Sequence, residues 1–277
     1  MTLSTAPRIN CDVIETRADR ARIFNLQRYS LNDGQGIRTV VFFKGCPHTC
    51  PWCANPESLS PKIETVRRES RCLHCAHCQR DVEECPSGAW EQIGRDVTQE
   101  ALLKEVLKDE IFFRASGGGV TLSGGEVLMQ AGFATRFLRA LRQWGIHTAI
   151  ETAGDEVLFD LKIMDPGQAR EQLAMDLPRV LENFRRLVEN GVHVIPRVPL
   201  IPGFTLCEKN FSQILSFLAP FALSDIHLLP FHQYGEPKYS LLGKRWAMAK
   251  VGAPSAAEMN RFTLMAEQAG FRVTVGG

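Results

Sequence analysis

Short apolar runs alternate with helix-like segments along most of the chain. Residues 38–44 read RTVVFFK, a β-branched and aromatic run typical of a strand buried on both faces. This alternation predicts βαβ units around a parallel sheet, and the number of units favours a full or partial (β/α) barrel over an open doubly wound sheet. The expected strands are 21–29, 38–44, 117–126, 147–152, 156–161, 192–197, 226–230 and 271–275, and the expected helices follow Thr98 and cover 127–144, 178–190, 208–218 and 255–269.

Seven of the nine cysteines lie between residues 46 and 85. The odd total and this crowding argue against a disulfide framework and for metal binding. Cys46, Cys50 and Cys53 follow the first buried strand with CxxxCxxC spacing, and thiolates so close together suit zinc or an iron–sulfur cluster. Zinc needs a fourth ligand, for which His48 is available, whereas three thiolates alone suit a [4Fe–4S] cluster with one iron open to an exogenous ligand.

A second cysteine group follows in a segment without hydrophobic periodicity. Cys72, Cys75, Cys78 and Cys85 read CxxCxxC and then Cys-Pro, as bacterial ferredoxin ligands do, although the last gap is longer. We expect an auxiliary [4Fe–4S] cluster with four cysteine ligands, and a zinc site that uses His74 or His77 is the alternative. This spacing divides the chain into residues 1–60, a small ferredoxin-like insertion at 61–95, and the remainder of the barrel at 96–277.

Polar residues stand where the expected strands end, which is where barrels of this class place their chemistry. Each group also has a plain structural reading: a Gly-Gly-Glu turn joins a strand to a helix, Asp160 and Lys162 form a buried ion pair, and His232 is a structural hydrogen-bonding residue. Their common position at the ends of the strands nonetheless predicts that they share one site at the mouth of the barrel. The residues are Gly124, Gly125, Glu126, Glu151, Thr152, Asp160, Lys162, Arg197 and His232.

Charge and hydrophobicity limit the partners. Thirty-two basic against 31 acidic residues leave a formal charge of +1, which provides no field for nucleic acid or anionic lipid. No run approaches the roughly 18 apolar residues of a membrane span. Residues 1–20 lack the apolar stretch of a secretory signal, so we expect a cytoplasmic protein without nucleic-acid or membrane partners.

Six ordered motifs together resemble a known family. They are the CxxxCxxC loop, DGQGIR at 33–38, SGGGVTLSGGE at 116–126, DLK at 160–162, RVPLIPG at 197–203 and LPFH at 229–232. The ensemble resembles the glycyl-radical-enzyme activating enzymes of the radical S-adenosylmethionine (SAM) superfamily, in particular members with a cysteine insertion that act on pyruvate formate-lyase. Gln35, Val127 and Glu151 replace the usual Pro, Pro and Asp of these motifs.

The resemblance implies a partial (β/α)6 radical SAM barrel and a defined reaction. A reduced [4Fe–4S] cluster and SAM would form a 5′-deoxyadenosyl radical, which takes a hydrogen from one glycine of a pyruvate formate-lyase-like (formate acetyltransferase-like) glycyl radical enzyme. Flavodoxin or ferredoxin would supply the electron, and the enzyme would be a monomer. No catalytic acid or base is expected, since the cofactor carries the chemistry.

The resemblance also implies roles for single residues. Glu126 would accept from the SAM ammonium, Lys162 would neighbour the SAM carboxylate, and Asp160 would join Glu151 and Thr152 at a cation. His232 would reach SAM from the sixth strand, and the loop of residues 33–38 would present or receive the protein substrate. The complete cofactor-binding set is Trp52, Cys53, Ala54, Gly124, Gly125, Glu126, Glu151, Thr152, Asp160, Leu161, Lys162, Ile163, Met164, Arg197 and His232.

Two other functions remain open on the sequence. A radical SAM enzyme for a small molecule is one, although the glycine-rich stretch and the 33–38 loop count against it. An electron-transfer protein that only holds clusters is the other, and it leaves the SAM-type motifs unexplained.

The interval between two expected strands is too short for this fold. Only Ala153, Gly154 and Asp155 separate HTAIET from EVLFDL, whereas parallel neighbours need a crossover of a dozen or more residues. We therefore expect that roughly a dozen or more residues are missing here, and that the Cα–Cα distance from Gly154 or Asp155 to its neighbour far exceeds the roughly 3.8 Å of a trans peptide.

Overall fold

A curved, largely parallel sheet forms the body of the molecule. The computed structural model describes residues 19–150 and 156–276, and in them nine strands pair in the order β11-β10-β9-β8-β7-β6-β2-β1-β5. All neighbours from β2 to β11 are parallel, while β1 is antiparallel to both β2 and β5. The strands are β1 Arg20–Ser30, β2 Arg38–Phe43, β5 Arg95–Thr98, β6 Gly119–Gly124, β7 His147–Ile150, β8 Glu156–Asp160, β9 His193–Leu200, β10 Asp225–Pro230 and β11 Arg272–Val275.

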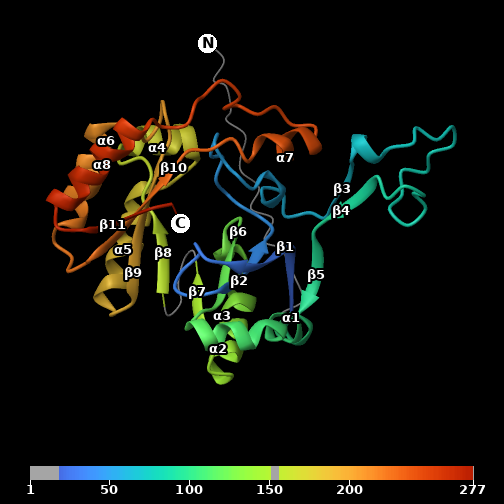
Figure 1. Ribbon diagram of the computed structural model, residues 1–277, viewed down its shortest axis with the longest axis horizontal. Coiled ribbons are helices and arrows are strands. Elements are labelled where there is room, and N and C mark those ends of the chain that lie inside the picture. Colours follow the sequence, from blue (N-terminus) through green and yellow to red (C-terminus); the bar gives the residue numbers. More distant parts are fainter. Residues whose placement is uncertain (1–18, 151–155, 277) are drawn as a thin grey trace, which may run out of the picture.

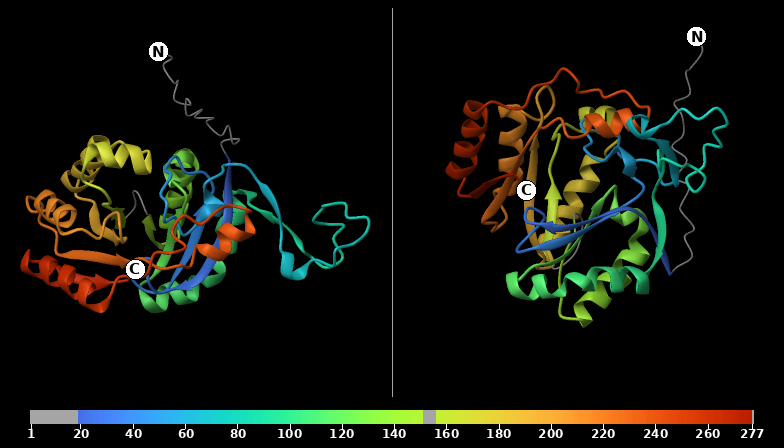
Figure 2. Two further views of the ribbon diagram at one scale, coloured as in Figure 1. Left: turned by 90° about the horizontal axis from the view of Figure 1, so that it is seen from above. Right: turned by 45° about the vertical axis from the view of Figure 1, so that its right-hand side comes forward.

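Helices cover the convex face of this sheet, as Figure 2 shows. Their buried side chains form the main core with outward residues of the strands, among them Val41, Val120 and Val157. Within the described residues, no helix combines the length and apolar character needed to cross a membrane. The helices are α1 Gln99–Val106, α2 Glu110–Ser116, α3 Ala131–Gln143, α4 Pro166–Leu173, α5 Leu177–Glu189, α6 Glu208–Leu218, α7 Glu236–Leu241 and α8 Ala256–Gln268, with 3-10 turns η1 Pro56–Ser58, η2 Glu69–Arg71, η3 Leu107–Asp109 and η4 Val127–Gln130.

The opposite, concave face of the sheet is unusually polar. Since side chains alternate along a strand, the neighbours of the core residues point to the other face. There the fully buried Arg38 donates to Thr121 Oγ1 at 2.6 Å and to the Val120 carbonyl at 2.8 Å. Glu156, Asp160 and Arg197 share this face, so the interior of the curved sheet presents charged groups rather than a packed apolar core.

The predicted partial barrel is confirmed, with local differences. The expected helix 127–144 is divided into η4 and α3, and the sequence patterns missed the short helices α2, α4 and α7. These three helices have only six to eight residues and complete about two turns, so their apolar periodicity is weak, whereas α1, equally short, was expected from its N-cap Thr98.

The pairing of β7 with β8 is parallel, as the barrel requires. Ala149 lies opposite Glu156 and Ile150 opposite Val157, so β8 begins beside the last two residues of β7. This register excludes a hairpin between the two strands. The predicted chain break at Gly154 or Asp155, like Glu151 and Thr152, lies outside the described residues.

An arm projects from the body, drawn in teal at the right of Figure 1. Its base is a two-stranded antiparallel sheet of β3 (Glu64–Arg67) and β4 (Trp90–Ile93), regular structure that the sequence pattern of this segment did not reveal. The fully buried Lys44 at the end of β2 joins arm and barrel, because its Nζ donates to the Glu57 carbonyl at 2.6 Å and to Glu64 Oε2 at 2.9 Å.

Candidate active site

The loops after several parallel strands are joined at one end of the sheet. Gly125 N donates to the Phe43 carbonyl at 2.9 Å and Glu126 N to the Gly45 carbonyl at 2.8 Å, which ties the turn after β6 to the loop after β2. Thr49 N donates to the Leu173 carbonyl at 3.2 Å and so attaches the same loop to α4. The turn after β6 and the end of α4 are therefore both attached to the cysteine-bearing loop that begins at Cys46.

Cys46, Cys50 and Cys53 are half-buried in this loop, where Cys53 N donates to the Cys50 carbonyl at 3.1 Å. Burial raises the pKa of Cys46 to about 12, and the neighbouring Cys50 and Cys53 contribute to the increase. Burial likewise raises the pKa of Cys53. Without a cation the Cys46 and Cys53 thiols are therefore held neutral, and three soft donors in one loop fit an iron–sulfur cluster.

The sulfurs are not arranged as a formed metal centre. Across residues 19–150 and 156–276, no three or more His, Cys, Asp or Glu side chains have an arrangement that could hold a metal ion. His48, the alternative fourth ligand for zinc, has a buried Nδ1 without a hydrogen-bond partner in the described residues.

A charged network lies beside the cysteine loop. Asp160 Oδ1 accepts from Arg197 Nε at 2.8 Å, and its Oδ2 is 3.4 Å from Lys162 Nζ. Burial favours neutral Asp160, but Arg197 and Lys162 outweigh it and hold the pKa of Asp160 below its ordinary value. Burial similarly opposes charge on Lys162, yet Asp160, Cys50 and Cys46 raise the pKa of Lys162. A permanent ammonium thus faces both a carboxylate and the cysteine loop.

Asn210 holds the segment after β8 in place and was missed by sequence reasoning. This buried side chain of α6 accepts from Met164 N at 2.8 Å and donates to the Lys162 carbonyl at 2.7 Å. Leu161 and Ile163, on either side of Lys162, are buried in the first and the second hydrophobic cluster, respectively. An Asn on the apolar stripe of a predicted helix was the available signal.

We expect Asn210→Leu to destabilise the protein by about 2–4 kcal/mol, because it leaves a buried N–H and a buried carbonyl without partners. Urea unfolding measures the change. The matched variant Gln213→Leu makes a similar replacement on the exposed face of α6 and is expected to alter stability by less than about 0.5 kcal/mol. Equal effects of the two variants would contradict the role assigned to Asn210.

The Gly-Gly-Glu turn has a packing role that differs from the predicted one. A Cβ on Gly124 would lie 2.4 Å from Phe43 N, and one on Gly125 would lie 2.2 Å from the Gly45 carbonyl oxygen. The missing side chains thus permit close approach of the protein's own backbone. Glu126 Oε1 accepts from Leu128 N at 3.0 Å and caps η4.

The other predicted residues near the cysteine loop differ in solvent exposure. Trp52 packs in the second hydrophobic cluster, with its ring 5.0 Å from that of Phe204. His232 is exposed and its ring stacks on Tyr234 at 4.1 Å, while burial lowers the pKa of His232. Ala54 is half-buried next to Cys53.

Helix α7 closes over the same loop, an arrangement that no sequence motif indicated. Lys238 Nζ donates to Asn55 Oδ1 at 2.8 Å. Burial raises the pKa of Tyr239 to about 12, with the nearby Cys53 and Cys50 as further causes.

The loop of residues 33–36 lies at the opposite end of the barrel, because it precedes β2. Thr121 Oγ1 donates to the Asp33 carbonyl at 2.7 Å, and Arg38 donates to the Gln35 carbonyl at 3.0 Å. This loop therefore borders the concave face at the end of the barrel that is far from the cysteine loop.

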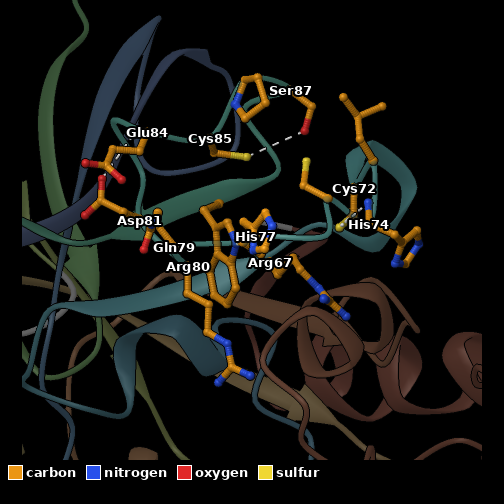
Figure 3. Close-up of a pocket in the computed structure, with 15 residues that line it drawn as sticks. Arg67, Cys72, His74, His77, Gln79, Arg80, Asp81, Glu84, Cys85 and Ser87 are labelled. Carbon is orange, nitrogen blue, oxygen red and sulfur yellow. Dashed lines mark hydrogen bonds between the residues drawn. The ribbon is translucent and has the colours of Figure 1, made fainter.

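Cys72, Cys75, Cys78 and Cys85 line one pocket of about 290 Å³ on the arm, shown in Figure 3. Three of the sulfurs have hydrogen-bond neighbours: His74 N is 3.4 Å from Cys72 Sγ, Trp90 Nε1 is 3.4 Å from Cys78 Sγ, and Ser87 Oγ is 3.6 Å from Cys85 Sγ. The Trp90 contact lowers the pKa of Cys78, and the Ser87 contact lowers the pKa of Cys85 to about 7. Such contacts favour thiolates, the form that binds metal.

Comparisons with known proteins agree with the cysteine motifs. A family model described as "4Fe-4S single cluster domain" matches residues 32–162. The chain is 66% identical to the Escherichia coli (strain K12) protein named "Pyruvate formate-lyase 2-activating enzyme", over 292 aligned positions that cover 100% of both chains. It is 34% identical to the "(2S)-3-sulfopropanediol sulfolyase activating enzyme" of Bilophila wadsworthia (strain 3_1_6), covering 88% of this chain and 95% of the relative.

A solved structure supports the fold independently. The crystal structure of a radical SAM methyltransferase from Sphaerobacter thermophilus matches 92% of this chain and 73% of that chain, with a TM-score of 0.55 and 16% sequence identity. The cysteine loop after β2, the parallel barrel and the full-length relatives lead to one assignment. The chain belongs to the glycyl-radical-enzyme activating enzymes, a family of radical SAM enzymes that use an iron–sulfur cluster and S-adenosylmethionine.

Proposed function

We propose that this enzyme generates the glycyl radical of a pyruvate formate-lyase-like partner. The observation that carries the proposal is the relative of 66% identity over the full chain, whose name states that activity. The half-buried Cys46, Cys50 and Cys53, with Lys162 beside them, support it as well.

When bound, the reduced cluster and SAM supply a 5′-deoxyadenosyl radical able to remove hydrogen from an unactivated C–H bond. The protein binds and orients these cofactors and excludes water from them. Cys46, Cys50 and Cys53 would hold the cluster, and Lys162 would pair with the SAM carboxylate. Glu126 would accept from the SAM ammonium, since its carboxylate has further acceptor sites besides the one that Leu128 N occupies.

The other predicted residues complete the SAM site in this proposal. Asp160 would bind a cation together with Glu151 and Thr152, two residues that lie outside the described part of the chain. The rest enclose the cofactor: Trp52, Ala54, Gly124, Gly125, Leu161, Ile163, Met164, Arg197 and His232.

We further propose that residues 61–95 form a ferredoxin-like domain with an auxiliary [4Fe–4S] cluster. Four cysteines line its pocket, and three of their sulfurs already have polar neighbours. The zinc alternative with His74 is less favoured, because His74 Nε2 lies 3.2 Å from Glu69 Oε1 and is engaged there.

We expect Cys85→Ala to lower the iron content from about eight to about four atoms per chain while the SAM-binding cluster persists. Iron and sulfide analysis of anaerobically purified protein measures this change. Cys207→Ala, which changes an exposed cysteine outside both motifs, serves as the control. Unchanged iron together with one zinc per chain would favour the zinc site.

Three features of the cellular reaction belong to the proposal as well. Flavodoxin or ferredoxin reduces the cluster in the cytoplasm, and the enzyme acts as a monomer.

The 292 aligned positions against 277 residues leave 15 positions at which this chain contributes no residue. We place them near residues 154–156, where the crossover between β7 and β8 is too short.

Electron paramagnetic resonance (EPR) tests the proposed function. The reduced enzyme, SAM and a pyruvate formate-lyase-like partner are expected to yield a doublet signal on the partner. A doublet only with a different class of glycyl radical enzyme would redirect the proposal to that partner, and SAM cleavage with small molecules alone would contradict it.

A further inference from the structure

Glu156, the first residue of β8, carries a carboxylate that the proposed SAM site does not use. The residue is 5% exposed, and its Oε1 has no hydrogen-bond partner among the described residues. Its Oε2 lies 3.9 Å from His193 Nδ1, beyond hydrogen-bonding distance. A buried carboxylate oxygen without a donor is costly, so its retention calls for a ligand that supplies one.

The 33–36 loop lies against this oxygen, with the Arg38 side chain beside it: a Cβ on Gly34 would lie 3.2 Å from Arg38 Nε. A Cβ on Gly34 would lie 3.1 Å from Glu156 Oε1, so this glycine brings the 33–36 loop against the carboxylate. His227 on β10 also has a buried Nδ1 without a partner in the described chain. Burial and Arg197 lower the pKa of His227, while Glu156 acts in the opposite direction, which places the two side chains within electrostatic reach.

Glu156 lies on the same face of β8 as Asp160, because the two residues are four positions apart. Four steps along a strand correspond to about 13 Å, the length of roughly four extended residues. An extended peptide that enters beside Gly34 and reaches the cysteine loop would therefore pass Glu156 about four residues from its reacting end.

We propose that Glu156 is a positioning residue that accepts a backbone N–H from the segment flanking the reactive glycine of the partner. A peptide backbone fits this position because its N–H groups supply the donor that Glu156 Oε1 lacks among the described residues. The inference rests on the proposed function, since it assumes a peptide substrate in the barrel.

Two synthetic peptides around the partner's glycine test it, one with five residues on each side and one with two. Glu156→Leu is expected to raise the dissociation constant of the long peptide, measured by fluorescence anisotropy, about tenfold. The short peptide does not reach Glu156, so its binding is expected to be equal in both proteins. Glu156→Gln keeps an acceptor and is expected to restore most of the affinity.

Two outcomes would overturn the inference. One is an unchanged affinity of Glu156→Leu for the long peptide. The other is an equal loss of affinity for both peptides, which would indicate a structural role of Glu156. Glu189→Leu, on the exposed end of α5, controls for loss of a negative charge, and iron content and SAM binding verify the loading of each variant. Peptide binding is measured without turnover, so absence of SAM cleavage in the wild-type enzyme would contradict the proposed function separately.

Discussion

Cys53→Ala is expected to lower the rate of 5′-deoxyadenosine formation at least about 1,000-fold, a loss of about 4 kcal/mol in transition-state stabilisation. Only three cysteines follow β2 in the loop, so removal of one leaves the cluster with two thiolates. His48 is a poor substitute, because an imidazole nitrogen does not match the soft thiolates that suit an iron–sulfur cluster. The assay is chromatography of the nucleoside produced by the reduced enzyme and SAM.

Cys207→Ala again provides the matched control, since Cys207 is exposed and lies outside both motifs. Its rate is expected to remain within about twofold of the wild-type rate. If Cys53→Ala retained the native rate, the assignment of the cysteine loop would be wrong.

Gly125→Ala has the second largest expected effect. The added methyl group would lie 2.2 Å from the Gly45 carbonyl oxygen, and backbone cannot yield as a flexible side chain can. The hydrogen bond from Glu126 N to the same carbonyl would be lost with the displacement. We expect a loss of stability of about 3 kcal/mol or more in urea unfolding, together with poor loading of the SAM-binding cluster.

Gly132→Ala separates this effect from a general response to added methyl groups. In α3 the new Cβ would meet only the Arg136 side chain at 3.6 Å, and alanine favours the helix by about 0.5–1 kcal/mol. A Gly125→Ala protein as stable as this control would show that the turn after β6 does not need its close contact with the cysteine loop.

Much of the barrel could be predicted because several of its strands, among them β2, β8 and β10, are largely apolar runs. The expected and observed boundaries of β2, β8 and β10 differ by no more than one residue. The strands β3 and β4 escaped detection because they are short, mostly polar and exposed on several sides, so no periodic pattern marks them.

The site was predicted as a set of residues but not as a set of contacts. Local spacing identified Asp160 and Lys162, whereas their third partner Arg197 depends on the register of β8 with β9, in which Asp160 and Arg197 lie opposite each other. Asn210 and Glu156 could not be assigned from local sequence, because their importance arises from groups distant in the chain.

Transfer of deuterium tests the central claim most directly. The reduced enzyme and SAM are incubated with a pyruvate formate-lyase-like partner whose glycines carry deuterium at the α-carbon, and the nucleoside is examined by mass spectrometry. Hydrogen abstraction from the partner's glycine predicts one deuterium in 5′-deoxyadenosine and a glycyl doublet in the EPR spectrum of the partner. Unlabelled 5′-deoxyadenosine in the presence of the radical-free partner would contradict hydrogen abstraction from its glycine.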